Sequence, residues 1–234
     1  MELRLLSSPA DRRAFALNLV ETRLSKGAGF CETDRSLVGE AHLAFGRLYA
    51  LFDNLGPDPD EMLAGFVLHD LATFPQSYPR PDLTHLPPET VIECGELWAK
   101  AAGSARLTRQ AAWILAGQLK ARAILLYPLY KPWNLSTFYN GDFDRVGDPI
   151  EWPYIRTLEG DRMFVQAMVS SGEKLARLVA EASQWGFQAT PDATHIIFAS
   201  PHRISTRQLR QRPHPAVGPS PQIEVGVAMA VSGN

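Results

Sequence analysis

The chain has 234 residues, of which 45% are hydrophobic and 21% charged, and its formal net charge is -2 at pH 7. This length suits one domain with extensions, and the hydrophobic content is enough for a sizeable core. The weak net charge argues against a dedicated nucleic-acid-binding protein. The two cysteines, Cys31 and Cys94, are too few for a disulfide framework or a metal cluster. With no signal-peptide run and no transmembrane-length apolar run, we expect a cytoplasmic protein without a membrane span.

The first third of the chain predicts a strand, a helix and a hairpin. Met1–Ser7 has strand character, and a helix is expected to follow as far as Leu24, with Ser8 as its N-cap and Pro9 in its first turn. Two apolar runs then flank a stretch dense in Asn, Gly, Pro and Asp, which is typical of turns. These runs, Leu43–Asp53 and Met62–Leu71, are expected to pair as a hairpin.

The middle of the chain predicts a strand–helix–strand unit behind a long loop. Thr73–Pro88 holds five prolines, which suit neither a helix nor a central strand. The unit itself consists of a strand over Thr90–Ala99, a helix over Leu107–Ala121 and a buried strand over Ala123–Tyr130. The expected later elements are short helical turns, a loop, a hairpin, a helix and a strand: Asn134–Asn140, Asp142–Trp152, Arg156–Leu158 with Met163–Val169, Glu173–Trp185 and Thr194–Ser200.

The C-terminal end differs in composition from the rest. Pro201–Gln222 contains five prolines, four arginines and no acidic residue, so we predict one domain over residues 1–200 and a flexible basic tail over 201–234. Two interpretations of the tail are open: a solvated extension without a role, or a segment that docks on an anionic partner or carrier.

The order of these elements resembles the GCN5-related N-acyltransferase (GNAT) fold. The features that carry the likeness are the hairpin containing Gly65-Phe66-Val67, the strand Thr90–Ala99, the helix after it, and the run Asn134-Leu-Ser-Thr-Phe-Tyr139. The resemblance implies an α/β (α+β) fold, with a mixed, mostly antiparallel central sheet flanked by helices. It also implies that two strands, Thr90–Ala99 and Ala123–Tyr130, splay apart.

The same resemblance implies a chemistry. Such a protein moves an acyl group from acyl-CoA or an acyl carrier protein to a small-molecule or peptide amine, without a metal. The Pro-rich stretch and the run Ile92–Trp98 are similar to autoinducer synthases and long-chain N-acyl amino acid synthases. A homodimer is one option for the oligomeric state.

Two sequence registers are candidates for the family's phosphate-binding motif. Lys100-x-x-Gly103-x-Ala105 keeps the central glycine, whereas Arg106-x-x-Arg109-x-Ala111 has the better spacing to the predicted helix. We prefer the second register, with Gly103 shaping the loop, because unpaired N–H groups at a helix N-terminus bind anions. The residues implied in binding the acyl donor are Leu97, Trp98, Ala99, Arg106, Leu107, Arg109, Gln110, Ala111 and Asn134.

Three residues are candidates for proton transfer. Glu93 and Glu96 lie on one strand, where a regular pleat would point them to opposite faces, and Gly95 between them is a candidate bulge. The resemblance implies a base on this strand that deprotonates the amine; Glu96 is our first choice and Glu93 the second. Tyr139 is implied as the acid that protonates the departing thiolate.

Other readings stay open. His69 and Asp70 at the hairpin end would contact an acceptor or be merely structural. One rival hypothesis is a non-catalytic protein of the same fold that binds an acyl thioester or a protein partner. A second rival is an unrelated α+β binding module whose basic tail engages RNA or an acidic protein.

Overall fold

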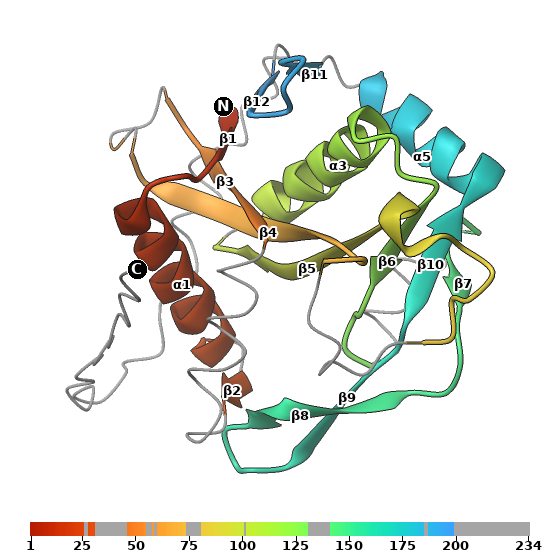
Figure 1. The fold of residues 1–234 in the computed structure, drawn as a ribbon. Helices are drawn as coiled ribbons and strands as arrows, with labels where there is room; N and C mark the ends of the chain where they lie inside the picture. The colour runs from red at the N-terminus through yellow and green to blue at the C-terminus, as the bar shows by residue number, and fades with distance from the viewer. Residues whose placement is uncertain are drawn as a thin grey trace, which may run out of the picture. The chain divides into compact units, whose positions relative to one another are not determined.

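The computed structural model describes residues 1–25, 28–30, 46–54, 58, 60–73, 81–100, 102–130, 141–184 and 187–198 (Figure 1). Within them a nine-stranded sheet has the order β11-β12-β1-β3-β4-β5-β6-β10-β7, and a second sheet has the order β2-β8-β9. The first half of the chain supplies β1 (Glu2–Leu5), α1 (Pro9–Leu24), β2 (Ala28–Phe30), β3 (Arg47–Phe52) and β4 (Met62–Asp70). The second half supplies η2 (Pro88–Thr90), β5 (Val91–Ala99), α3 (Ala102–Gln118), β6 (Ala123–Leu126), β7 (Asp144–Arg145), β8 (Ile150–Thr157), β9 (Arg162–Val165), β10 (Met168–Ser171), α5 (Gly172–Ser183), β11 (Phe187–Ala189) and β12 (His195–Phe198).

The two sheets are almost entirely antiparallel. Of the strand pairs in the described residues, β5 with β6 runs parallel and the others run antiparallel. A parallel pair needs a crossover connection, and α3 between β5 and β6 provides it. The predicted mixed, mostly antiparallel sheet flanked by helices is therefore confirmed.

Helix α1 begins at the residues that the sequence predicts as its N-cap and first turn. The Ser8 hydroxyl oxygen accepts a hydrogen bond from the Asp11 backbone N–H at 3.1 Å, and Pro9 opens the helix. The buried side of α1 carries Phe15 and Leu19, which pack with Leu48 of β3 and Val67 of β4. The predicted first strand, helix and hairpin are confirmed.

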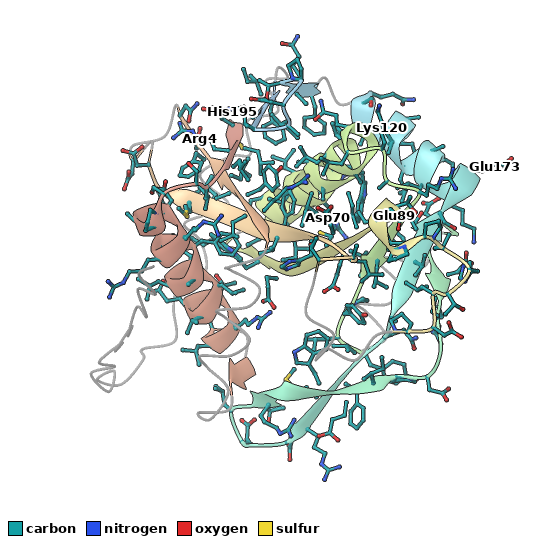
Figure 2. All side chains as sticks on the ribbon, viewed as in Figure 1. Arg4, Asp70, Glu89, Lys120, Glu173 and His195 are labelled. Atoms are coloured by element: carbon teal, nitrogen blue, oxygen red, sulfur yellow. The ribbon has the colours of Figure 1, made fainter. Side chains whose placement is uncertain are left out.

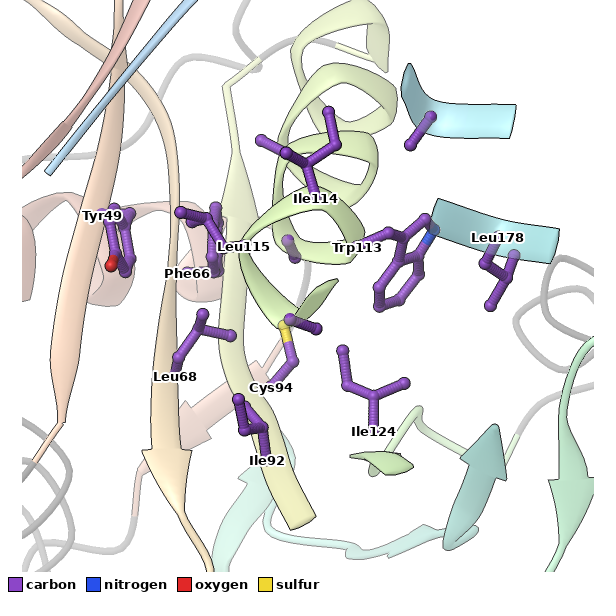
Figure 3. Close-up of a cluster of buried hydrophobic side chains, with 14 of the residues drawn as sticks. Tyr49, Phe66, Leu68, Ile92, Cys94, Trp113, Ile114, Leu115, Ile124 and Leu178 are labelled. Carbon is purple, nitrogen blue, oxygen red and sulfur yellow. The ribbon is translucent and has the colours of Figure 1, made fainter. Parts of the chain in front are cut away.

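The helices cover the main sheet on two faces (Figure 1). On one face lie α3 and α5, which contact β4 to β6 and β10, while α1 contacts β3 to β5 on the other. The larger core lies under α3 and α5 (Figure 3) and includes Tyr49, Phe66, Leu68, Leu115 and Ile124. The two faces of β4 and β5 are consequently buried against different helices, and the site described below lies on the α1 face.

Several predicted boundaries were wrong. Helix α3 begins at Ala102, before the predicted Leu107, and β6 ends at Leu126, before the predicted Tyr130. The predicted loop Asp142–Trp152 contains β7 and the start of β8. Strands β2 and β11 were not predicted, because three-residue strands carry almost no periodic signal.

The predicted tail, the predicted helical turns Asn134–Asn140, residues 31–45 and parts of the predicted loops lie outside the described residues, so the division at residue 200 stays a prediction. In the part of the chain that the structure describes, no helix has the length and hydropathy needed to span a membrane.

Candidate active site

Strand β6 pairs with only the beginning of β5. Their parallel register joins three residue pairs: Val91 with Ala123, Ile92 with Ile124, and Glu93 with Leu125. Strand β5 continues to Ala99 in contact with β4, whereas β6 ends at Leu126. The two strands thus form a V that closes at Glu93 and opens toward the end of β5.

A change of partner explains why the chain leaves β5 after β6. The Tyr130 N–H donates to the Phe164 carbonyl at 2.8 Å, and the Gln166 N–H donates to the Pro128 carbonyl at 3.0 Å. Leu129 and Val165 form an antiparallel bridge between these two bonds. The segment after β6 is therefore held by β9 and the link that follows it, which turns the chain away from β5.

A β-bulge bends β5 on its side of the V. Gly65 pairs with Trp98 and Val67 pairs with Gly95, so three steps on β5 match two on β4. The extra residue is accommodated at Glu96, whose φ of 51° lies in the left-handed region. The predicted bulge is therefore present, but the unusual backbone angle belongs to Glu96 and not to Gly95.

The bulge reverses the facing of the β5 side chains beyond it. Ile92 and Cys94 lie in the core under α3, whereas Trp98, at an even spacing from both, lies in the cluster with Phe15 of α1. In a regular strand residues at even spacing share a face, so the extra residue at Glu96 has switched the alternation.

The prediction that Glu93 and Glu96 point to opposite faces is therefore wrong. Glu93 alternates with Ile92 and Cys94 and so faces α1, and Glu96 contacts Arg23 of α1. Sequence spacing alone could not show this, because the extra residue changes which positions share a face. Both carboxylates lie on the α1 face of β5, one at the vertex of the V and one on the arm that diverges from β6.

Glu96 is held by an ion pair. Its Oε2 accepts a hydrogen bond from Nη2 of Arg23, in the last turn of α1, and the Glu96 side chain is only 5% exposed. A buried carboxylate needs such a partner because removing an isolated charge from water costs several kcal/mol. Nothing in the sequence linked Arg23 to Glu96, because the two lie far apart in the chain.

Glu93 lies opposite His69. The two residues are directly paired in the β4–β5 register, and each is 1% exposed. Directly opposed residues of an antiparallel pair share a face, with Cβ atoms about 4.5–5.5 Å apart. A carboxylate and an imidazole are thus buried together at the vertex of the V.

Cys94 belongs to the opposite face. It is buried, and burial, with the neighbouring Glu93 charge, raises the pKa of its thiol to about 12. A thiol with this pKa is protonated at neutral pH and is a poor nucleophile.

The N-terminus of α3 lies beside the open end of the V. Strand β5 ends at Ala99 and α3 begins at Ala102, and the Lys100 N–H is bonded to the Leu63 carbonyl of β4 at 3.0 Å. Gly103 therefore lies in the first helical turn, where it is exposed. The register Lys100-x-x-Gly103-x-Ala105, and not the preferred one, covers the amides that a helix leaves unpaired.

The preferred register lies inside the helix. The N–H groups of Arg109, Gln110 and Ala111 are more than one turn from the helix start, where intrahelical bonds occupy them, and Ala111 is completely buried. Arg106 is exposed and Arg109 half-buried. Burial, with the nearby Arg106 charge, lowers the pKa of Arg109. In this register, only the side chains of Arg106 and Arg109, and not main-chain N–H groups, could bind a phosphate at the surface.

The remaining predicted donor-binding residues are divided between the arm of the V and the core. Leu97 is 38% exposed, Trp98 is buried edge-on against Phe15, and Leu107 packs against the main core. Ala99 pairs with Ala64 of β4. The predicted Asn134 and Tyr139 lie outside the described residues.

A groove of about 770 Å³ lies elsewhere, against α5 and the end of α3. Among described residues its lining does not include Glu93, Glu96 or the first turn of α3; it consists of Leu86, Gly117, Ala121, Arg122, Ser171, Gly172, Leu175, Ala176, Val179 and Ala180. The described residues also contain no cluster of side chains able to hold a metal ion.

The fold was compared with solved structures. FeeM, an N-acyl amino acid synthase from uncultured soil microbes, superposes with a TM-score of 0.56 at 12% identity, over 79% of this chain and 98% of its own. The chain has the GNAT fold. The resemblance predicted from the order of elements is therefore confirmed at the level of the fold, including the splayed pair of strands.

Weaker likenesses were also found. A putative phosphinothricin N-acetyltransferase gives a TM-score of 0.49 at 17% identity, over 73% of this chain and 98% of its own. A GCN5-related N-acetyltransferase from Kribbella flavida gives 0.48 at 14% identity, over 73% and 96%. The sequence matches no protein-family model and no curated protein sequence.

Proposed function

We propose that the protein is an N-acyltransferase that moves an acyl group from an acyl thioester to an amine. The observation that carries this proposal is the V between β5 and β6, closed by three residue pairs and flanked at its open end by the first turn of α3. A narrow, extended ligand fits between two diverging strands because their main-chain groups along the V are not paired with each other. The phosphates of such a ligand would meet the helix N-terminus.

The residues at the open end fit a phosphorylated acyl donor, either acyl-CoA or an acyl carrier protein. Exposed Gly103 leaves room for close approach to the first-turn N–H groups of α3, and exposed Arg106 adds a cation one turn further on. When bound, the donor supplies an activated acyl carbon. Leu97 and Trp98, on the arm of β5, would lie along the donor.

The carboxylates on β5 supply the proton chemistry. An amine attacks only when neutral, so a carboxylate on the acceptor side must take a proton from it. Glu96, our first choice, and Glu93 both lie on the α1 face, on the arm and at the vertex of the V. In this proposal Tyr139 gives its phenolic proton to the departing thiolate, and Asn134 helps to bind the donor.

The ion pair between Arg23 and Glu96 bears on the choice of base. The Glu96 Oε2 atom is occupied by Nη2 of Arg23, so this oxygen takes part in holding α1 to the bulge. Glu93 is paired with His69 in the β4–β5 register instead, and the Glu-to-Gln variants described below decide between the two carboxylates.

Turnover provides the test. Release of free thiol would be followed with acetyl-, octanoyl- and palmitoyl-CoA and with the same acyl groups on carrier protein, each with a panel of amino acids and simple amines. We expect turnover with at least one pair, and a loss of about 10²–10⁴-fold in kcat for the Glu-to-Gln variant of whichever carboxylate is the base. Glu89→Gln, an exposed carboxylate on η2 (Figure 2), is the matched control and should retain full activity.

Donor binding has its own test at Gly103. In Gly103→Asp a negative charge enters the first turn of α3, which favours the helix but repels phosphate, whereas Gly103→Asn has the same shape without the charge. We expect the aspartate to weaken acyl-CoA binding by about tenfold or more, and the asparagine to have little effect. Equal affinities in the two variants would place the donor elsewhere. Binding without turnover across the whole panel would select the non-catalytic alternative.

A further inference from the structure

The second sheet connects the end of α1 with the chain that continues β6. Its strands have the order β2-β8-β9, and Leu129, beyond the end of β6, forms a bridge with Val165 at the outer edge of β9. Strand β2 follows α1 along the chain and contacts it. Figure 1 shows β8 and β9 running from β2, below α1, toward β7 and β10. We call the three strands β2, β8 and β9 the strap.

Each end of the strap is fixed to one arm of the V. On the side of β6, the Tyr130 N–H donates to the Phe164 carbonyl of β9 at 2.8 Å. On the side of β5, α1 is attached to the bulge by the ion pair between Arg23 and Glu96. The two arms are therefore joined twice, once at the vertex and once through α1 and the strap, and these elements form a closed loop.

The strap lies on the α1 face of the main sheet. Tyr127, just after β6, packs against Trp152 of β8 with ring centroids 5.6 Å apart. Tyr127 also belongs with Leu125 to a cluster separate from the core under α3. Leu125 alternates along β6 with Ile124 and Leu126, which lie in that core. Tyr127 and the strap strand that it contacts are therefore on the face opposite α3.

An acceptor amine is expected inside this closed loop. On the face toward α3, Ile92 of β5 and Ile124 of β6 are 3% and 0% exposed and belong to the core. The α1 face carries both candidate bases, Glu93 and Glu96. An amine that gives its proton to either carboxylate must therefore reach the thioester on the face that the strap spans.

We propose that the acceptor is a small free amine, and that the strap excludes lysine side chains within a polypeptide. This inference rests on the proposed N-acyltransferase function and names its acceptor class. A lysine amine ends a four-carbon stem, so its backbone and both flanking stretches of chain would have to lie close to the thioester, at the loop. An extended polypeptide is commonly held at a free sheet edge. The β9 edge beside the V is already paired with Leu129 and Tyr130.

The transfer itself is balanced with a small amine. The C–N bond forms as the C–S bond breaks, and the nitrogen loses one proton while the departing sulfur gains one. The products are an amide and a free thiol. An acceptor that arrives as an ammonium first loses one further proton, which passes through the base to solvent. The acceptor class changes none of these steps, so free thiol reports turnover with every acceptor.

The first measurement does not depend on turnover. Ala28 of β2 is directly paired with Thr157 of β8. Opposed residues of an antiparallel pair have Cα atoms about 4.5–5.5 Å apart, which a disulfide can span. We expect Ala28→Cys/Thr157→Cys, in a Cys31→Ser background, to form this cross-link on oxidation, detected by mass spectrometry. Ala28→Cys in the same background is the control. Failure of the two cysteines to cross-link would refute the paired strap.

The second measurement compares acceptors with the acyl donor that turns over. The acceptors are the panel of amino acids and simple amines, and a short peptide with blocked ends and one internal lysine. We expect kcat/KM for the best small amine to exceed that for the peptide by about 100-fold or more. The cross-linked variant should acylate the small amine within about twofold of its own reduced form, with an unchanged donor KM, because a small acceptor enters without opening the strap.

The outcomes separate the two proposals. If the peptide lysine is acylated as efficiently as the best small amine, the restriction to small acceptors is refuted while the transferase function stands. Loss of small-amine turnover on cross-linking, with recovery on reduction, would also refute it, because the strap would then have to open for every acceptor. If the wild type transfers no acyl group to any amine or peptide, the transferase function fails, and the acceptor class fails with it.

Discussion

Gly65 on β4 marks a place where the sheet has no room for a side chain. A Cβ added there would lie 2.5 Å from Phe15 Cε2, 2.8 Å from Trp98 Nε1 and 2.9 Å from the Tyr49 carbonyl oxygen. Because one of these neighbours is backbone and the two rings pack edge-on against each other, they cannot all move aside. We expect Gly65→Ala to lower the free energy of unfolding by about 1–3 kcal/mol, measured by urea denaturation.

The control is a glycine in open surroundings. Gly103 is exposed in the first turn of α3, where alanine is the better helix former, so Gly103→Ala should not destabilise the protein. Equal urea midpoints for Gly65→Ala and the wild type would contradict the crowding at Gly65.

At the scale of single residues, the sequence shows which residues a strand contains better than it shows the face of the sheet to which each side chain points. The strand carrying Glu93 and Glu96 was predicted correctly, but the direction of each side chain depends on a bulge at a non-glycine residue with positive φ. A left-handed Glu has no sequence signature, and its stabilising partner Arg23 comes from a helix formed much earlier in the chain. The shared face of the two carboxylates could therefore not be predicted.

At the scale of elements, the Arg23–Glu96 ion pair joins the last turn of α1 to the bulge in β5. Removing one member leaves a buried charge without its counter-ion, which costs about 3–5 kcal/mol. We expect Arg23→Met to lower the free energy of unfolding by about this amount, whereas exposed Arg13→Met should change little. The double variant Arg23→Met/Glu96→Gln should lose less than the sum of the two single variants. Strict additivity in urea denaturation would contradict direct coupling.

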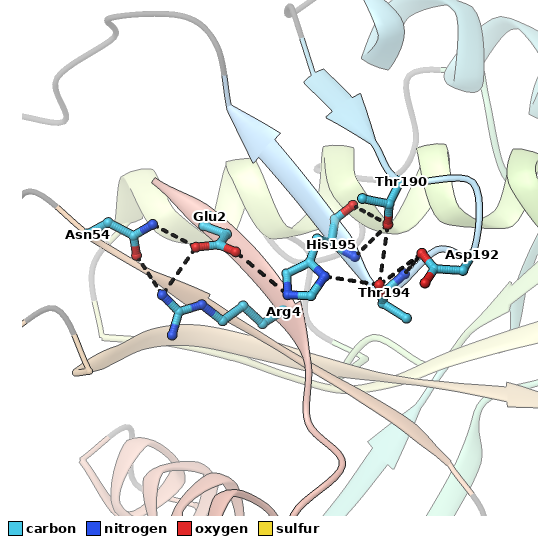
Figure 4. A network of polar contacts seen from close by, with 7 residues as sticks. All are labelled: Glu2, Arg4, Asn54, Thr190, Asp192, Thr194 and His195. Atoms are coloured by element: carbon cyan, nitrogen blue, oxygen red, sulfur yellow. Dashed lines mark hydrogen bonds and ion pairs between the residues drawn. The ribbon is translucent and has the colours of Figure 1, made fainter.

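The turn between β11 and β12 is an element held by polar contacts (Figure 4). Hydrogen bonds from the hydroxyls of Thr190 and Thr194, and from the Thr194 N–H, lower the pKa of Asp192 to about 2. The Thr194 hydroxyl lies 2.8 Å from the carboxylate. Since the folded pKa is below the ordinary value of about 3.9, the stabilisation is present above about pH 4 and is lost as the pH falls toward 2.

Asp192→Asn should remove this contribution. We expect its melting temperature to be below that of the wild type at pH 7, and the difference to shrink between about pH 4 and pH 2. Exposed Asp148→Asn is the control and should follow the wild type throughout. A difference in melting temperature that stays constant from pH 7 to pH 2 would show that the Asp192 charge does not stabilise the turn.

At the scale of the whole molecule, the order of elements identified the fold, because hairpin, crossover and helix each carry a local signal. How far β6 pairs with β5 could not be predicted from the sequence. Strand β6 was predicted to run to Tyr130, since its residues stay apolar, but Pro128–Tyr130 instead pair with the end of β9. That partner lies more than thirty residues away, and competition between distant strands leaves no local pattern.

The V also divides the main sheet, because three residue pairs are the whole of the described β5–β6 register. A donor bound in the V would connect the two parts and bind only the folded protein. At a donor concentration of about 100 times Kd, this linkage adds about 2.7 kcal/mol. For a chain of this size we expect the melting temperature to rise by about 5–10 °C with the preferred acyl-CoA.

Hydrogen exchange locates the effect. Amides flanking the V, over 97–99 on β5 and at Tyr127 and Leu129, should exchange more slowly with bound donor, because a ligand between the strands covers them. Amides of β11 and β12 lie beyond β1 in the sheet and should not change. Gly103→Asp at the same donor concentration should reduce both the exchange protection and the rise in melting temperature. Protection that spread evenly over the sheet, or appeared at α5 and not at the V, would contradict donor binding between β5 and β6.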